Sequence, residues 1–570
     1  MLVLDRVSVF VGESATPVLE EVSLSFPEGH FGAIVGGSGS GKTTLLKAIA
    51  GIAPGDEEGL ISWRGRNLEE EDFLPSEIGY VPQFSIAHDE LTVLESVVFA
   101  ARLRTRRPSE AGFREDAEHL LEEVGLGEFG GRRVGVLSGG QKRRLALAIE
   151  LASRPDILLC DEVTSGLDAH SEDGIVKLLH RLSRQRRRLV LTVTHSLAHM
   201  DLYDSVTVLT GGVVAYHGPP AFAAHYFGVE RPGDIYERLE SRTPQEWAAS
   251  WTKHQRAVAE AAERPSSEAG EDAETDRGGD VEEPAEPPGF LVQSAVLLVR
   301  RMVIFSRSKA ELLLQAGLIF GFPVLVAVFA WNGLPAVTNL SMGLDLDVVQ
   351  QLTEARDFLA QGSRVGSLVS GIVMFQVVLL TLMGANNAGR EVAAERDLFE
   401  KEKLSGLDPL AYVVSKAAFL LLLVAAQSSW MGFFVREVCG FPGDAAMQFG
   451  FLFLVNAAMT ALCLGISSWL RSPGQASIAS IYLVGFQLPL SGAVLALPEW
   501  LGPLVRPFIS AYWSWSGILQ TLKNERTYDI VQMVVQSPLS PAPLCAWVLL
   551  LHIATGLVAA WFGCERRRIG

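Results

Sequence analysis

Residues 36–43 read Gly-Gly-Ser-Gly-Ser-Gly-Lys-Thr and directly follow the apolar run Ala33-Ile34-Val35. A glycine, four residues and then Gly-Lys-Thr, placed between a strand and a helix, is the pattern of a loop that wraps phosphate groups. The glycines let backbone N–H groups turn toward the phosphates, while Lys42 supplies a cation and Thr43 a hydroxyl for Mg²⁺. The stretch therefore predicts a nucleotide-binding α/β domain, although small-molecule kinases and GTPases share this loop.

A second glycine-rich turn, Leu137-Ser138-Gly139-Gly140-Gln141, precedes a helix that begins Lys142-Arg143-Arg144. The free N–H groups and positive charge of such a helix start suit a γ-phosphate. On its own the turn would be interpreted as an ordinary Ser-capped helix.

Two carboxylates follow soon after, because the apolar strand Ile157-Leu158-Leu159-Cys160 ends in Asp161-Glu162. At a strand tip Asp161 can reach Mg²⁺, directly or through water, and Glu162 can polarise a water for in-line attack. Two adjacent acids after a strand are also common in surface turns. The order of all the motifs distinguishes these readings. Two further motifs complete the series: Ser165-Gly166-Leu167-Asp168, and the strand 189–194 followed by His195. Gln83 lies between the first two motifs.

In this order the motifs resemble the Walker A loop, Q-loop, signature motif, Walker B strand, D-loop and switch histidine of an ABC-transporter ATPase. The resemblance implies Glu162, His195 and Gln83 as catalytic residues, and Thr43, Gln83 and Asp161 around Mg²⁺. It implies an ATP site formed by Gly36, Gly37, Ser38, Gly39, Ser40, Gly41, Lys42, Thr43, Thr44, Ser138, Gly139, Gly140, Gln141, Asp168 and Phe10, the last against adenine. Because one chain holds one motif set, it also implies a head-to-tail dimer.

Composition divides the 570 residues into a charged first part and an apolar second part. The expected order is an ATPase domain at 1–228, an acidic and disordered linker at 229–289, an interfacial connecting helix at 290–310 and a membrane domain at 311–570. The linker explains much of the net charge of −17, because residues 260–286 hold eleven acids and two arginines. We therefore expect a solvated linker in preference to an acidic docking surface, and no nucleic-acid partner.

Six apolar segments are long enough to cross a membrane, which needs ~20 helical residues. They are about 312–331, 365–385, 411–434, 446–470, 475–497 and 544–562. Positive residues cluster before the first segment, between the second and third, between the fourth and fifth, and after the sixth. This predicts cytoplasmic termini and an all-α six-helix domain. The segment 498–543 is too long for a simple turn and is expected to be re-entrant or interfacial.

An ATPase domain followed by six spans resembles the G-subfamily, or White-type, half-transporters with an ABC-2-type membrane domain. Residues 293–301 are similar to that subfamily's connecting helix. Arg390-Glu391, Glu395-Arg396 and Phe399-Glu400-Lys401-Glu402 are similar to its coupling segment, a cytoplasmic helix that rests on the ATPase. By the same resemblance, cargo would lie between the second and fifth spans, near Phe375, Gln376, Phe486 and Gln487.

The expected function is ATP-driven export of an apolar or amphipathic substrate, such as a lipid, by a dimer of half-transporters, with a homodimer favoured. Few ionisable residues within the spans argue against ion coupling. Two alternatives remain: a membrane regulator or force transmitter without cargo flux, and an ATP-dependent importer. Five scattered cysteines indicate neither a zinc site nor disulfides. The N-terminal run MLVLDRVSVF does not have the pattern of a signal peptide, so we expect the first domain to stay in the cytoplasm. The expected location of the protein is the bacterial cytoplasmic membrane.

Overall fold

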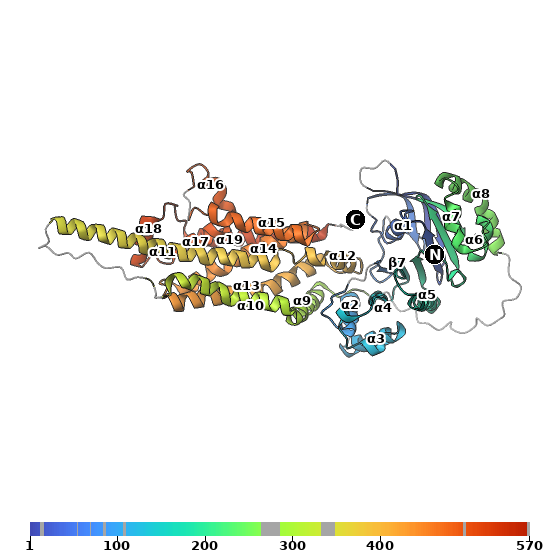
Figure 1. Cartoon of the computed structure of the whole chain (residues 1–570), viewed down its shortest axis with the longest axis horizontal. Helices are drawn as coiled ribbons and strands as arrows, with labels where there is room; N and C mark the ends of the chain where they lie inside the picture. The colour runs from blue at the N-terminus through green and yellow to red at the C-terminus, as the bar shows by residue number, and fades with distance from the viewer. Residues whose placement is uncertain are drawn as a thin grey trace. The chain divides into compact units, whose positions relative to one another are not determined.

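The computed structural model describes residues 1–11, 16–53, 55–68, 70–83, 87–106, 110–263, 286–331, 334, 348–493 and 497–566. Its internal contacts divide the chain into two compact units (Figure 1). The first consists mainly of Met1–Val296 and Asp397–Asp408, and the second of Leu297–Arg396 and Pro409–Arg566. The predicted order of an α/β domain and a helical domain is confirmed.

The first unit is built on two sheets. A six-stranded sheet has the order β10-β9-β3-β8-β7-β6, in which all neighbours except β10 and β9 are parallel, and a smaller antiparallel sheet has the order β2-β1-β4-β5. The central strands are fully buried because they are almost entirely apolar, as expected for parallel strands covered on both faces. The strands are β1 Leu2–Phe10, β2 Leu19–Phe26, β3 Phe31–Gly36, β4 Asp56–Trp63, β5 Arg66–Asn67, β6 Ile78–Val81, β7 Ile157–Asp161, β8 Leu189–Val193, β9 Ser205–Thr210 and β10 Val213–Gly218.

The helices of this unit begin at polar caps. Thr92 and Glu95 form a capping box at α2, Ser138 and Gln141 form another at α4, and Asp168 accepts the first N–H groups of α5. The helices are α1 Lys42–Ile49, α2 Val93–Arg104, α3 Glu110–Glu123, α4 Gly139–Leu151, α5 Ala169–Arg184, α6 Pro220–Phe227, α7 Ile235–Leu239, α8 Pro244–Glu263 and α12 Arg396–Leu404.

The predicted linker starts too early. Residues 229–263 contain α7 and α8, and α8 packs on β10, so the first unit continues through Glu263 (Figure 1). Trp247 and Trp251, one turn apart on α8, bury their rings against Phe227 and Tyr216 respectively. Two tryptophans at this spacing form an apolar stripe. The rest of the predicted linker, 264–285, lies outside the described residues.

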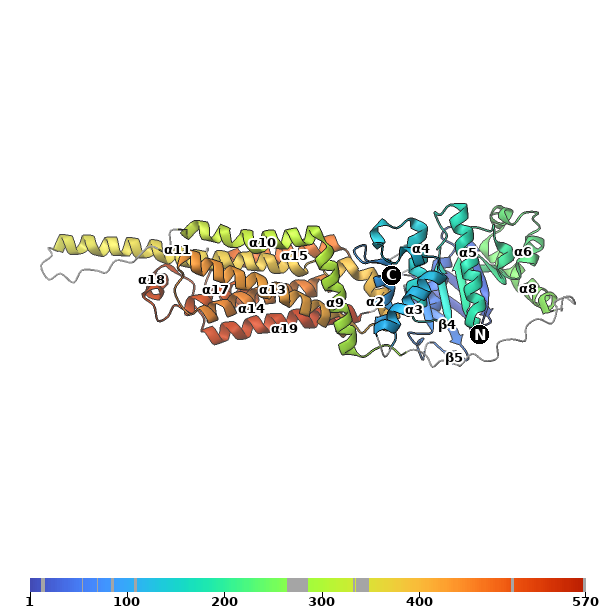
Figure 2. The same ribbon diagram turned by 90° about the horizontal axis from the view of Figure 1, so that it is seen from below.

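The second unit is a helical bundle, and Figure 2 shows its long helices running side by side. Five described helices, α10, α11, α13, α14 and α19, are long and apolar enough to cross a membrane. The fifth predicted span coincides with α15, which has 18 residues and is not among those five, so the six-span topology stays a prediction. The helices are α9 Phe290–Arg307, which begins in the first unit, α10 Lys309–Ala327, α11 Val348–Ala388, α13 Pro409–Cys439, α14 Ala445–Trp469, α15 Pro473–Leu490, α16 Gly502–Val505, α17 Ser510–Gln520, α18 Arg526–Val534 and α19 Ala542–Glu565.

The helix α17 explains the long segment 498–543. It has 11 residues, too few to span a bilayer, yet it is buried against α14 and α19. Its first turn is held from outside, because the amide of Gln487 accepts a hydrogen bond from the Ala511 N–H at 3.0 Å. The contact gives Gln487 a structural role, and the re-entrant or interfacial placement of this segment stays a prediction. Phe486, its neighbour in the predicted cargo cavity, is 56% exposed.

A buried cluster of amides joins four of the long helices. Gln427 on α13 donates to Gln315 of α10 at 2.9 Å and to Asn387 of α11 at 3.0 Å. It also accepts from Asn387 at 2.9 Å and from Asn456 of α14 at 3.0 Å. Buried amides require such partners, so the cluster sets the rotation of these helices relative to one another.

Ionic contacts mark one end of the bundle. Glu391 is bound by Arg301 and by Lys416, whose Nζ lies 2.9 Å from Oε1, and Lys416 also reaches Glu395 at 2.6 Å. The predicted coupling segment is therefore divided. Glu391 and Glu395 belong to the second unit, whereas Lys401 belongs to the first.

Candidate active site

Four parallel strands bring the predicted site residues to one edge of the large sheet. The neighbours β3, β8, β7 and β6 run in the same direction, so their carboxyl ends lie together. Gly36 ends β3, Asp161 ends β7, and His195 and Gln83 follow β8 and β6 within two residues. Open α/β sheets bind ligands at this edge.

The loop after β3 is closed around its own backbone. Lys42 is 5% exposed and donates to the carbonyl oxygens of Gly36 at 3.0 Å and Gly37 at 2.8 Å. Burial lowers the pKa of Lys42, against the opposing influence of Glu162 and Asp161. A Cβ at Gly36 would lie 2.3 Å from the Leu209 carbonyl oxygen, so only glycine fits where β3 turns into the loop.

Asp161 is directed at the start of α1. Its Oδ1 accepts from the Thr43 hydroxyl at 3.0 Å, and its Oδ2 accepts from Tyr80 at 3.3 Å. Burial raises the pKa of Asp161, and these two hydrogen bonds act in the opposite direction. Thr43 and Asp161, which were both predicted to lie around Mg²⁺, are therefore in contact, whereas Tyr80 was not predicted. Its position on β6, next to β7, was the available signal.

Glu162 is held between two other predicted residues. Gln83 Nε2 donates to its Oε2 at 2.7 Å, and His195 Nε2 lies 2.9 Å from its Oε1. The residue has a left-handed backbone with φ 48°, which is uncommon outside glycine and is found where a site holds a side chain in place. The arrangement leaves Glu162 positioned by both of its oxygens.

The signature turn, residues 137–141, has no hydrogen bond to the cluster of Gln83, Glu162 and His195 among the described residues. Ser138 and Gln141 satisfy each other in the capping box, while the Ser138 and Gly139 side of α4 is exposed. Within the part of the chain that the structure describes, no hydrogen bond joins this turn to the phosphate loop. Asp168 caps α5 instead, and hydrogen bonds from Ser171 and His170 lower its pKa.

The remaining predicted site residues lie on β1, in the phosphate loop and in α1. Phe10 is half-buried at the end of β1. Ser40 is buried, and among the described residues its hydroxyl has no hydrogen-bond partner. Thr44, like Lys42 and Thr43, lies in the first turn of α1. Ser38, Gly39 and Gly41 complete the loop before it.

A buried ionic network at the far end of α4 was not predicted. Glu150 is 1% exposed and is bound in bidentate fashion by Arg104 at 3.1 and 3.2 Å. Lys401 of α12 lies 2.8 Å from the same carboxylate. The helix that starts at the signature turn therefore ends on the predicted coupling segment. A lone acid late in an apolar helix was the only signal.

Comparison with known families assigns both parts of the chain. The ABC transporter family matches residues 19–165, and the ABC-2 type transporter family matches residues 292–515. The chain joins an ABC transporter ATPase domain to an ABC-2 type membrane domain.

Two relatives match different shares of this chain. The ABC transporter ATP-binding/permease protein Rv1747 of Mycobacterium tuberculosis is 28% identical over 97% of this chain. A sulfate/thiosulfate import ATP-binding protein, CysA of Ralstonia nicotianae, is 38% identical over 35% of this chain. The chain spans 61% and 55% of these two relatives.

A solved structure resembles the ATPase domain. It is the dimeric structure of a post-hydrolysis state of the ATP-binding cassette MJ0796 bound to ADP and Pi, 29% identical, covering 39% of this chain and 99% of that chain with a TM-score of 0.36. In the ABC ATPase domain of the present chain, the matched region 19–165 contains the phosphate loop, Gln83, the signature turn and both strand-tip carboxylates.

Proposed function

We propose that the chain is an ATP-hydrolysing half-transporter that dimerises and exports an apolar or amphipathic substrate across a membrane. The observation that supports this most is the separation of two half-sites: Lys42, Asp161 and Glu162 gather at the sheet edge, while the signature turn at Ser138 is exposed. A second copy can supply the missing half.

The residues at the sheet edge have distinct roles in hydrolysis. Lys42 now holds loop carbonyls, and when ATP enters, its ammonium turns to the β- and γ-phosphate oxygens. Glu162 accepts a proton from the attacking water, while His195 and Gln83 hold its carboxylate in line. The exposed N–H groups of Gly139 and Gly140 on the partner stabilise the γ-phosphate charge.

The donor set fits Mg²⁺. The Thr43 hydroxyl and the Asp161 carboxylate are 3.0 Å apart beside the loop, and both are oxygen donors of the kind that Mg²⁺ prefers. Gln83 is held at Glu162 through its Nε2. When bound, the ion neutralises charge on the phosphates as the γ-phosphoryl group leaves.

The membrane domain supports export without ion coupling. The amide cluster around Gln427 is uncharged, and the ionic residues Glu391 and Lys416 lie at one end of the bundle. With that end cytoplasmic, together with the ATPase domain and both termini, the protein is an integral protein of the bacterial cytoplasmic membrane. The substrate is a lipid or hydrophobic molecule, and a homodimer is favoured.

The role of Glu162 is tested by Glu162→Gln in the purified full-length protein. We expect the ATPase rate to fall by about 10²- to 10⁴-fold, the range for loss of a general base, while ATP binding is retained. An undiminished rate would remove Glu162 from the mechanism.

The composite site is tested by complementation. Lys42→Ala and Gly139→Asp each inactivate a homodimer, and Gly139→Asp has room, because nothing lies within 4 Å of a Cβ at Gly139. Co-expressed, differently tagged copies form heterodimers in which one site is doubly altered and the other intact. Activity regained only in purified heterodimers supports the proposal, and activity of either variant as a monomer contradicts it.

Transport itself is tested in reconstituted vesicles. ATP-dependent flux of at least one fluorescent lipid or amphiphile, absent in Glu162→Gln, supports export. ATPase activity without flux of any amphiphile would instead support a regulator or force transmitter.

A further inference from the structure

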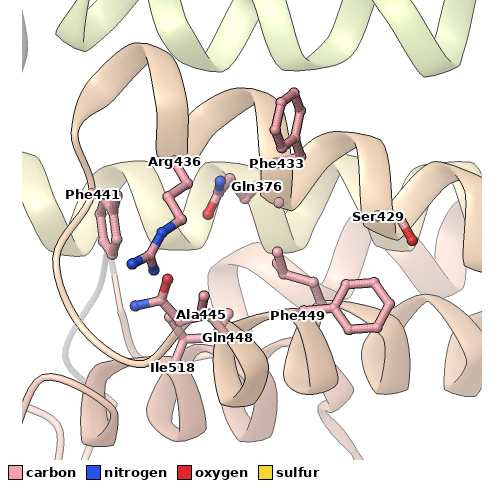
Figure 3. A pocket seen from close by; sticks show the side chains of 11 residues that line it. Gln376, Ser429, Phe433, Arg436, Phe441, Ala445, Gln448, Phe449 and Ile518 are labelled. Atoms are coloured by element: carbon pink, nitrogen blue, oxygen red, sulfur yellow. The ribbon is translucent and has the colours of Figure 1, made fainter.

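A cavity of about 240 Å³ lies between four helices of the membrane domain, α11, α13, α14 and α17 (Figure 3). Gln376 of α11, Arg436 of α13 and Gln448 of α14 line it, together with Phe441 and Phe449. Figure 3 shows the Arg436 guanidinium and the two amides directed toward one space. A charged group and two amides beside aromatic rings form an amphipathic pocket.

Two polar groups of this pocket, Arg436 and Gln376, have unused hydrogen-bonding capacity, whereas Gln448 Nε2 donates to the Pro442 carbonyl at 2.6 Å and to the Thr521 hydroxyl at 3.2 Å. Arg436 donates to the Gly443 carbonyl at 3.0 Å, which uses one of its five N–H groups. Gln376 is 5% exposed, and its amide has no hydrogen-bond partner among the described residues. Because Gln376 lines the pocket, a ligand in this space can form hydrogen bonds with its amide.

The positive charge of Arg436 indicates which kind of ligand suits the pocket. Across the described ranges, no carboxylate forms an ion pair with Arg436. Of the two acids nearest to Arg436 in sequence, Glu437 is exposed on α13 and Asp444 caps α14. Arginine binds phosphate and carboxylate oxygens through paired N–H groups. The Arg436 guanidinium is therefore a cation without an ion-pair partner among the described residues, and it suits an anionic ligand.

The position of Arg436 along α13 indicates where such an anion comes from. Twenty residues of α13 separate Lys416 from Arg436, which is ~30 Å at 1.5 Å per residue. This equals the thickness of a hydrocarbon core, so Arg436 reaches the headgroup level opposite the end marked by Lys416 and Glu391. The volume suits a headgroup with the first part of a chain, because a whole drug-sized ligand occupies about 300 Å³ or more.

We propose that this pocket is a binding site for the anionic headgroup of a phospholipid in the leaflet opposite the ionic end of the bundle. The phosphate contacts Arg436 and Gln376, and the acyl chain leaves along Phe433 and Phe449, which are 59% and 39% exposed. The site lies within one chain, and the proposal does not depend on transport or dimerisation.

Binding of dioctanoyl phosphatidylglycerol to the full-length protein in neutral detergent, without nucleotide, tests this site. We expect an affinity at least tenfold higher than for dioctanoyl phosphatidylcholine, and no competition from inorganic phosphate at equal concentration. Arg436→Gln removes this preference. The matched control is Arg364→Gln, the same change at an exposed position of α11 that does not line the pocket.

Equal affinity for both lipids, an unchanged preference in Arg436→Gln, or displacement by inorganic phosphate would overturn the proposal. Because Arg436 also holds the Gly443 carbonyl, Gln376→Leu provides a second variant that keeps this contact. It is expected to weaken phosphatidylglycerol binding by at least threefold with an unchanged melting temperature, and full affinity in this variant would also count against the site.

Discussion

The buried network around Glu150 allows a quantitative test of the link between the signature helix and α12. Lys401→Met removes one of the two cations that neutralise Glu150. At 2.8 Å and an effective dielectric constant of about 20, the attraction that is lost is roughly 6 kcal/mol. Burying the lysine opposes this, and loss of one partner from a buried pair usually destabilises by about 3–5 kcal/mol. Arg104 still binds Glu150, so we expect about 3 kcal/mol.

The assay is the fraction of full-length protein that still binds a fluorescent ATP analogue after heating. At about 2–4 °C per kcal/mol for a domain of this size, the apparent melting temperature should fall by about 6–12 °C. Lys177→Met is the matched control, because Lys177 pairs with Asp173 on the surface with 64% of its side chain exposed. Such a pair contributes about 0–1 kcal/mol.

Glu150→Gln should be more destabilising than Lys401→Met, because it leaves Arg104 and Lys401 buried without a carboxylate. The double variant should lose less than the sum, by at least about 1 kcal/mol. A Lys401→Met protein as stable as the Lys177→Met control would refute this reasoning.

The same network predicts sensitivity to acid. Burial tends to raise the pKa of Glu150, but Arg104 and Lys401 outweigh it, so the pKa lies below its ordinary value of 4.5. The stabilisation is complete above pH 4.5 and is lost as the pH falls from there through the lowered pKa. Melting curves of the wild type between pH 7 and pH 3.5 should show this loss, and Lys401→Met should show less of it.

Three other variants test separate features. Gly36→Ala should lower the nucleotide-free melting temperature, because its Cβ would lie 2.3 Å from a backbone oxygen, whereas Gly37→Ala, with nothing within 4 Å, should not. Gln427→Leu removes the hydrogen-bond partner of Gln315 Oε1 and of Asn387 Nδ2, while Asn456 keeps its bond to Ser428. Each buried atom left without a partner costs about 1–3 kcal/mol, so the detergent-solubilised protein should melt at a lower temperature. His195→Ala should lower kcat by about 10²-fold and change the KM for ATP by less than about threefold, because Gln83 still holds Glu162, and a wild-type kcat would exclude this role.

The motifs of the predicted nucleotide site could be found in the sequence, whereas the role of each residue stays a prediction. Its parts are short local signals: a glycine pattern that shapes backbone, and acids that directly follow apolar strands. Parallel strands then place Asp161, Glu162, Gln83 and His195 at one edge without further information. The same locality explains the apolar helices, since each is recognised by its own length and composition.

Features that depend on how helices rotate against one another could not be predicted in this way. The sequence places Trp247 in the predicted linker, whereas in the structure it lies on α8, which packs on β10. Glu150 contacts Lys401 because of where α12 lies in the fold. Gln376, Arg436 and Gln448 lie on three helices and share no motif. Contacts between side chains that lie far apart in the sequence depend on how entire helix faces pack against one another. The pattern of apolar and polar residues along one helix does not specify its partner helix.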